Sequence, residues 1–135
     1  MKEAIDAICD LAASRGVRLA FDAEQQSLQT GIFNWTVEYM RKYNKGAPGQ
    51  AVVYCTYQCY LKAAAQILAE HLSLARKEGF ILGVKLVRGA YLASDPRHLL
   101  HDTKTDTDMT YDGLHPSDKG FDIIANMLVK AMEKK

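Results

Sequence analysis

The sequence has few cysteines and no arrangement of them that would build a disulfide framework or a zinc site. The 135 residues include three cysteines, Cys9, Cys55 and Cys59, an odd number without a Cys-x-x-Cys pair. Paired cysteines are typical of small secreted domains, and closely spaced thiolates are typical of structural zinc sites. We therefore expect a reducing compartment and cysteines that pack in the interior, as free cysteines commonly do.

The chain also lacks an excess of charge of either sign. Seventeen basic and sixteen acidic side chains give a net charge of +1, so electrostatic capture of nucleic acid is not expected. It has no run of about eighteen apolar residues that would span a membrane. Residues 2–6 are an ordinary amphipathic segment, without the Arg-rich, acid-poor composition of a transit peptide. These absences predict a soluble protein that does not bind nucleic acid.

What the sequence does contain is an alternation of helical and strand patterns. Apolar residues recur at helical spacing before Gly16, between residues 25 and 43, and from about 60 to 78, where Gly79 is placed as a helix cap. Short apolar runs at 17–21, 51–56 and 80–87 predict strands. Nearly continuous apolar strands that alternate with helices favour an α/β fold of parallel βαβ units. A one-sided apolar stripe near the end predicts a C-terminal amphipathic helix.

Polar groups follow each predicted strand. Because ligands gather at the carboxyl ends of parallel strands, we expect these groups to meet on one side of the sheet. They are Asp22 and Glu24 after the first strand, Tyr57 and Gln58 after the second, and Arg88, Gly89 and Tyr91 after the third.

The stretch 83–91 is the most informative part of the chain. An apolar strand runs here into a cation, a glycine and an aromatic residue. Arg88 and Gly89 lie at the strand end, where a ligand could approach the bare backbone. This arrangement is typical of a flavin pocket.

Three ordered blocks, 18–26, 53–62 and 83–91, resemble proline dehydrogenase, in particular its fungal mitochondrial form. The resemblance covers about residues 1–112 and implies a central part of a flavin-binding (βα)8 barrel. With about three strands, and a length well below the roughly 250 residues of a full barrel, the expected fold is a partial barrel. The resemblance further implies a mitochondrial protein that oxidises L-proline to pyrroline-5-carboxylate with FAD and passes the electrons to a quinone.

The resemblance also implies a cofactor site. Lys85 is similar to a cation beside the reactive nitrogen of the flavin, where positive charge favours the reduced ring. Gln58 is similar to an amide that hydrogen-bonds the ring. The wall of the site would be formed by Val87, Arg88, Gly89 and Ala90. From the residues alone, Lys85 could instead be a strand-edge lysine that reaches solvent.

The substrate site follows from the same resemblance. Asp22 is similar to a carboxylate at the bottom of the proline pocket, and Tyr91 to an aromatic residue that lines it. An acid directly after a strand is also a common helix cap. The chain contains no adjacent arginines, so the family's Arg-Arg pair for the substrate carboxylate is absent, as is its early-strand lysine. Aromatic residues at helical spacing, Trp35, Tyr39 and Tyr43, are expected to pack rather than to stack on a cofactor.

The end of the chain has a different likeness. Residues 112–125 are similar to the C-terminal block of SGNH hydrolases, in which Asp112 and His115 would complete a Ser-His-Asp triad. A serine in a Gly-Asp-Ser setting is absent, and a turn at Asp112-Gly113 before a helix explains the same residues. The alternating acids at 102–108 lack the glycine and glutamate of a calcium loop, so no metal site is predicted. We therefore divide this composite chain into 1–112 and 113–135.

Three functions are compatible with these features. FAD-dependent proline oxidation is the leading hypothesis. A non-catalytic α/β domain that forms homo-oligomers through its open sheet edges is the second. An SGNH-type esterase fragment is the third.

Overall fold

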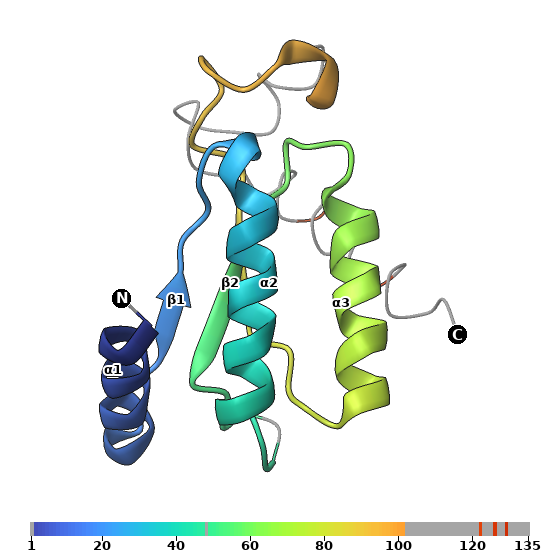
Figure 1. The fold of residues 1–135 in the computed structure, drawn as a ribbon. Helices are drawn as coiled ribbons and strands as arrows, with labels where there is room; N and C mark the ends of the chain where they lie inside the picture. The colour runs from blue at the N-terminus through green and yellow to red at the C-terminus, as the bar shows by residue number, and fades with distance from the viewer. Residues whose placement is uncertain (1, 48, 102–121, 123–125, 127–128, 130–135) are drawn as a thin grey trace.

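A computed structural model describes residues 2–47 and 49–101, together with Asp122, Asn126 and Val129. Within residues 2–101, three helices alternate with three strands (Figure 1). Their bounds are α1 Lys2–Arg15, β1 Leu19–Phe21, α2 Gln26–Tyr43, β2 Val53–Gln58, α3 Ala64–Glu78 and β3 Val84–Val87, followed by a 3-10 turn at Arg97–Leu99. None of the helices in the described ranges is long and apolar enough to cross a membrane.

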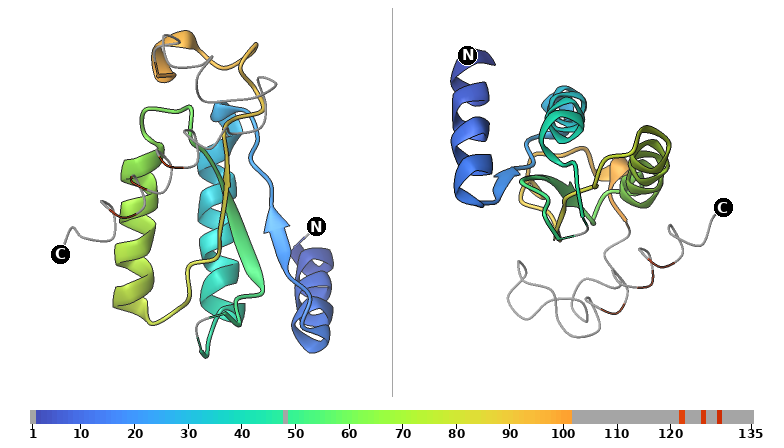
Figure 2. Two further views of the ribbon diagram at one scale, coloured as in Figure 1. Left: turned by 180° about the vertical axis from the view of Figure 1, so that it is seen from behind. Right: turned by 90° about the horizontal axis from the view of Figure 1, so that it is seen from below.

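The strands form one parallel sheet in the order β1-β2-β3. Helices α2 and α3 lie side by side over one face of this sheet, and α1 lies next to β1 (Figures 1 and 2). The predicted α/β class and the parallel pairing are therefore confirmed. In the described part of the chain the sheet is open, with β1 and β3 at its edges, so a closed or barrel-like sheet is not shown.

Several element boundaries differ from the sequence prediction. Strands β1 and β3 begin at Leu19 and Val84 rather than at residues 17 and 80. Helix α3 begins at Ala64 rather than near 60, because the chain after β2 continues to pair with neighbouring strands and loops. Cys59 N–H donates to Val87 O at 2.8 Å, and Lys62 N–H donates to Leu99 O at 3.0 Å. Strand β2 itself begins and ends two residues later than predicted. The predicted glycine caps are confirmed, since Gly16 and Gly79 have φ of 64° and 72°.

The core lies between β2 and helices α2 and α3. Because side chains alternate along a strand, Val53, Cys55 and Tyr57 face this layer and are almost completely buried. The predicted packing of the cysteines is confirmed for Cys9 and Cys55, whereas Cys59 is half-buried. Burial raises the pKa of the Cys55 thiol to about 12, so this thiol is unreactive at neutral pH.

Helix α1 packs differently from the prediction. The apolar residues at helical spacing before Gly16 are Ala4, Ile5, Ile8, Leu11 and Ala12. Of these, Ile8 and Leu11 are 56% and 51% exposed. Ala12, a member of the same set, is buried together with Cys9, and Ile5 packs against the core. The helix-forming residues were identified correctly, and the buried face was identified only in part.

Asn44 joins three elements at the amino end of the sheet. It follows α2 and is completely buried. Its side-chain NH2 donates to Val53 O and Ile81 O at 2.7 and 2.9 Å, and its Oδ1 accepts from the N–H groups of Val52 and Val53 at 2.9 and 2.8 Å. The amide therefore uses both hydrogens and both lone pairs on the chain entering β2 and β3.

Candidate functional site

The three strand exits meet around one cleft of about 570 Å³. This volume is typical of small-molecule sites. The cleft is lined by residues 22–24, Thr56, Gln58 and residues 85–91. The predicted convergence is therefore confirmed with one exception, Tyr57, which faces the helices and hydrogen-bonds His71 Nδ1 at 2.8 Å. Every residue predicted for the cofactor and substrate sites lines the cleft.

A row of polar side chains crosses the floor of the cleft. Strand register places Thr56 opposite Lys85, and Phe21 opposite Cys55, so Asp22 comes level with Thr56 from the first strand. Thr56 Oγ1 donates to Asp22 Oδ1 at 3.2 Å, and Lys85 Nζ forms an ion pair with the same oxygen. The row is thus a consequence of parallel register and of the two-residue period of each strand.

The electrostatics of the row follow from this ion pair. The hydrogen bond from Lys85 holds the pKa of Asp22 below its ordinary value. Asp22 is therefore a carboxylate at neutral pH. Its side chain is 70% exposed and that of Lys85 is 43% exposed, so both groups remain accessible to a ligand. Lys85 lies on the edge strand β3 and is partly exposed to solvent, and it also lines the cleft. The two interpretations of this lysine, a solvent-exposed edge residue and a binding residue, are therefore compatible.

Gln58 connects the loops on either side of it. The side chain is 2% exposed. Its Nε2 donates to Glu24 O at 3.2 Å, and its Oε1 accepts from Ala90 N–H at 2.8 Å. A primary amide has a second hydrogen and a second lone pair, and among the described residues these have no further partner, which leaves capacity for a ligand. Gln58 thus joins the segments after β1 and β3 that form two sides of the cleft.

The wall after β3 contains the one glycine among the described residues that line the cleft. Gly89 has φ of 153°, a conformation that other residues rarely adopt. Tyr91 follows, and its hydroxyl donates to Glu24 Oε2 at 2.9 Å. This carboxylate is the main cause of a raised pKa of Tyr91, so the hydroxyl stays protonated at neutral pH. A bare backbone wall, a cation and an amide with free capacity suit the flat polar ring of a flavin.

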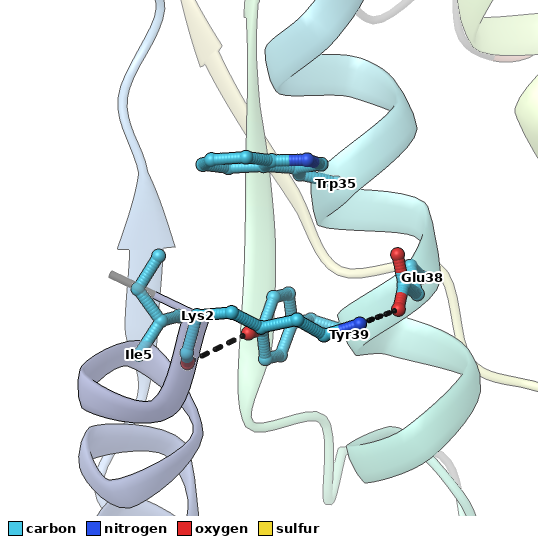
Figure 3. A pocket seen from close by; sticks show the side chains of 5 residues that line it. All are labelled: Lys2, Ile5, Trp35, Glu38 and Tyr39. Atoms are coloured by element: carbon cyan, nitrogen blue, oxygen red, sulfur yellow. Dashed lines mark hydrogen bonds and ion pairs between the residues drawn. The ribbon is translucent and has the colours of Figure 1, made fainter.

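A second cavity lies between α1 and α2 (Figure 3). Its volume is about 60 Å³, and Lys2 and Glu38 form an ion pair of 2.9 Å at its side. Tyr39 is 5% exposed and stacks on Phe21 at 5.6 Å, which confirms that it packs. Trp35 is 44% exposed beside the cavity, so it packs less than expected. The space is too small for a cofactor.

The other predicted features lie outside the described residues. These include the acids at 102–108 and the pair Asp112 and His115. Within the residues that are described, no three potential metal ligands gather at one place.

Comparison with known proteins shows the family of this chain. The proline dehydrogenase family model matches residues 1–131. The chain belongs to the proline dehydrogenase family. This match continues beyond residue 112 into the segment that resembled SGNH hydrolases, and the hydrolase likeness is not shown. No solved structure matched the chain.

Individual members of the proline dehydrogenase family align with most of the chain. A probable mitochondrial proline dehydrogenase of Schizosaccharomyces pombe is 46% identical over 110 residues, covering 82% of this chain and 22% of that protein. Mitochondrial proline dehydrogenase 1 of Homo sapiens is 44% identical over 95 residues, covering 70% of this chain and 15% of that protein. The chain therefore spans about a fifth of the length of these relatives.

Sequence reasoning missed one residue that completes the floor of the cleft. Thr56 was assigned to a buried strand and not to a site. It lies two positions before Gln58, and residues two apart point to the same face of a strand. This spacing was the available signal. Glu24 was recognised as a strand-end acid, but its bond to Tyr91 depends on the fold of two loops.

Proposed function

We propose that this chain contributes the flavin and substrate cleft for FAD-dependent oxidation of L-proline to pyrroline-5-carboxylate, with a quinone as the final electron acceptor. Membership of the proline dehydrogenase family supports this proposal. The observation that carries it is the meeting of all the predicted site residues around one cleft. The mitochondrial names of the relatives support a mitochondrial location.

Each part of the cleft has a role in this proposal. A bound FAD would supply the hydride acceptor for this oxidation. Lys85 supplies positive charge beside the ring, and the remaining amide capacity of Gln58 binds its polar edge. Gly89 and Ala90 provide a wall without large side chains.

The substrate side of the cleft is formed by other groups. Asp22 holds Lys85 and Thr56 in the row across the floor. Tyr91, fixed by Glu24, lines the space for proline. Asp22 thus orients its neighbours and need not transfer a proton.

The proposed organisation keeps the division at residue 112. Residues 1–112 supply the cleft as part of a barrel, and 113–135 add a C-terminal helix with an SGNH-like pattern. Asp122, Asn126 and Val129 are helical and exposed, which supports a helix there. No observation favours an esterase.

Binding of FAD by the purified chain tests the function. We expect the visible absorbance band of a retained flavin, which bleaches when L-proline is added without oxygen. Lys85→Met should weaken retention, whereas Lys45→Met, at an exposed loop lysine, should not. A folded chain that retains no flavin would contradict the proposal. If that chain is a dimer by size-exclusion chromatography, self-association through the edges of β1 and β3 becomes the better explanation.

A further inference from the structure

Tyr60 and Asp95 lie beside the wall of the cleft and are not among the described residues that line it. The ring of Tyr60 occupies the space next to Gly89. A Cβ atom added to Gly89 would come within 2.5 Å of this ring, well inside van der Waals contact. The ring therefore supports the one wall position that has no side chain.

The backbone of Tyr60 is joined to the same wall. Its N–H donates to Arg88 O at 2.8 Å, which extends the pairing between β2 and β3 beyond the last strand residue. Its carbonyl accepts from His101 N–H at 2.9 Å. Because both backbone groups of Tyr60 are hydrogen-bonded, its backbone is held in place and its ring is kept against Gly89.

The hydroxyl of Tyr60 ends on a buried carboxylate. It donates to Asp95 Oδ2 at 2.6 Å, and Asp95 is 7% exposed. Desolvation, reinforced by this carboxylate, raises the pKa of Tyr60 well above its ordinary value. The hydroxyl thus remains a donor throughout the physiological range.

Asp95 connects the three loops at the carboxyl end of the sheet. Its Oδ1 accepts from the N–H of Gln26, the first residue of α2, at 3.2 Å. Its own N–H donates to Tyr91 O at 2.8 Å. Gln25, the residue before α2, makes no capping side-chain bond, so Asp95 supplies the negative charge that favours this helix start. One carboxylate therefore links the exits of β1, β2 and β3.

We propose that Tyr60 and Asp95 form a positioning pair that holds the wall at 88–91 in its flavin-binding shape. This inference rests on the proposed function, because it assumes that the cleft binds a flavin. Neither residue contacts the flavin in this proposal. They act through the backbone of Gly89 and Tyr91.

A matched pair of tyrosine variants tests this role. Tyr60→Phe removes the hydroxyl and keeps the ring against Gly89. Tyr43→Phe is the control, since Tyr43 makes a bond of the same 2.6 Å length to Asp10 on α1, away from the cleft. We expect Tyr60→Phe to raise the Kd for FAD about tenfold, as loss of a charge-assisted bond would, and Tyr43→Phe to leave it unchanged. Flavin fluorescence quenching measures both.

Hydrogen exchange in the flavin-free chain gives a second readout. The amides of Ser94 and Asp95 are bonded to Tyr91 O at 3.0 and 2.8 Å. Tyr60→Phe should accelerate exchange of the peptide 88–95, and Tyr43→Phe should not. Asp95→Asn should resemble Tyr60→Phe in both measurements. If it fails to fold, Tyr60→Phe still decides the result.

The outcomes separate this inference from the proposed function. Equal FAD affinity for Tyr60→Phe and Tyr43→Phe would overturn the positioning role while leaving flavin binding intact. Absence of FAD binding by the unmodified chain would overturn the proposed function. In that case, unchanged exchange at 88–95 would overturn the positioning role as well, and faster exchange would support it as a property of the wall.

Discussion

The two ends of the sheet are both held by a buried polar side chain that joins three segments, but they are built differently. At the amino end, Asn44 makes four side-chain bonds, all to backbone groups. At the carboxyl end, Gln58 and Asp95 join loops through backbone and side-chain partners. Two buried atoms there, Gln26 Oε1 and Gln29 Nε2, have no hydrogen-bond partner among the described residues.

This difference indicates that the amino end of the sheet serves stability and the carboxyl end serves binding. The amino end uses all the hydrogen-bonding capacity of its central amide and leaves none for a ligand. The carboxyl end surrounds a cleft, exposes charged groups such as Asp22 and Lys85, and keeps part of its capacity unused. The same division, stability at one end of the strands and ligands at the other, is general for parallel α/β folds.

Asn44→Ala should give the largest effect. It leaves buried N–H and C=O groups at the start of β2 and before β3 without partners. We expect a loss of about 3 kcal/mol or more in the free energy of unfolding, measured by urea denaturation. Asn34→Ala, at an exposed position of the same helix, should change it little. Equal effects would mean that Asn44 does not secure the amino end.

Gly83→Ala should give the next largest loss of stability. A Cβ atom at this position would lie 2.1 Å from Val53 O, so the backbone must move at the start of β3. We expect a loss of about 2 kcal/mol in thermal or urea unfolding. Gly31→Ala in α2, with nothing within 4 Å of the new atom, should be neutral or stabilising. A tolerated Gly83→Ala would show that the close approach of β2 and β3 is not required.

Gly89→Ala should affect binding more than stability. Its φ of 153° and the adjacent Tyr60 ring both oppose a side chain. We expect a Kd for FAD about tenfold higher, with a loss of about 1–2 kcal/mol in stability. Gly49→Ala is the control, because Gly49 also has positive φ, 92°, but lies in the loop before β2. A similar loss of FAD affinity in both variants would contradict the view that only the carboxyl end of the sheet serves binding.

The smallest expected effect is a pH dependence of stability that comes from His71, in the core between the two ends of the sheet. Burial lowers the pKa of His71, whose Nδ1 is bonded to Tyr57. The unfolded chain therefore binds a proton more readily than the folded one, and stability should fall as pH drops below about 6.5. Urea unfolding at pH 7.5 and 5.5 measures this. His71→Asn should reduce the pH dependence and His98→Asn, at an exposed site, should not. If His71→Asn loses as much stability between pH 7.5 and 5.5 as the unmodified chain does, the acid sensitivity comes from another group.

Most of the architecture could be predicted because it depends on local patterns. Glycine caps, apolar strands and parallel pairing followed from the sequence, and so did the meeting of Asp22, Gln58 and Gly89 at one edge. The exposure of Ile8 and Leu11 could not be predicted, since they fit the same helical spacing as the buried Ala12 and the choice among them depends on tertiary packing. The role of Asp95 was also out of reach. Its partner Gln26 lies 69 positions away, and no periodicity relates the two.

The long reach of Asp95 also bears on how the chain folds. Asn44 joins Val52 and Val53 across 8 and 9 positions, a loop that closes at small entropic cost, and it reaches Ile81 across 37 positions. The carboxylate of Asp95 instead meets Tyr60 and Gln26 across 35 and 69 positions, and such non-local contacts form slowly. We therefore expect the contacts of Asn44 with the start of β2 to form early and the cleft to take shape last, when the rest of the sheet is already in place.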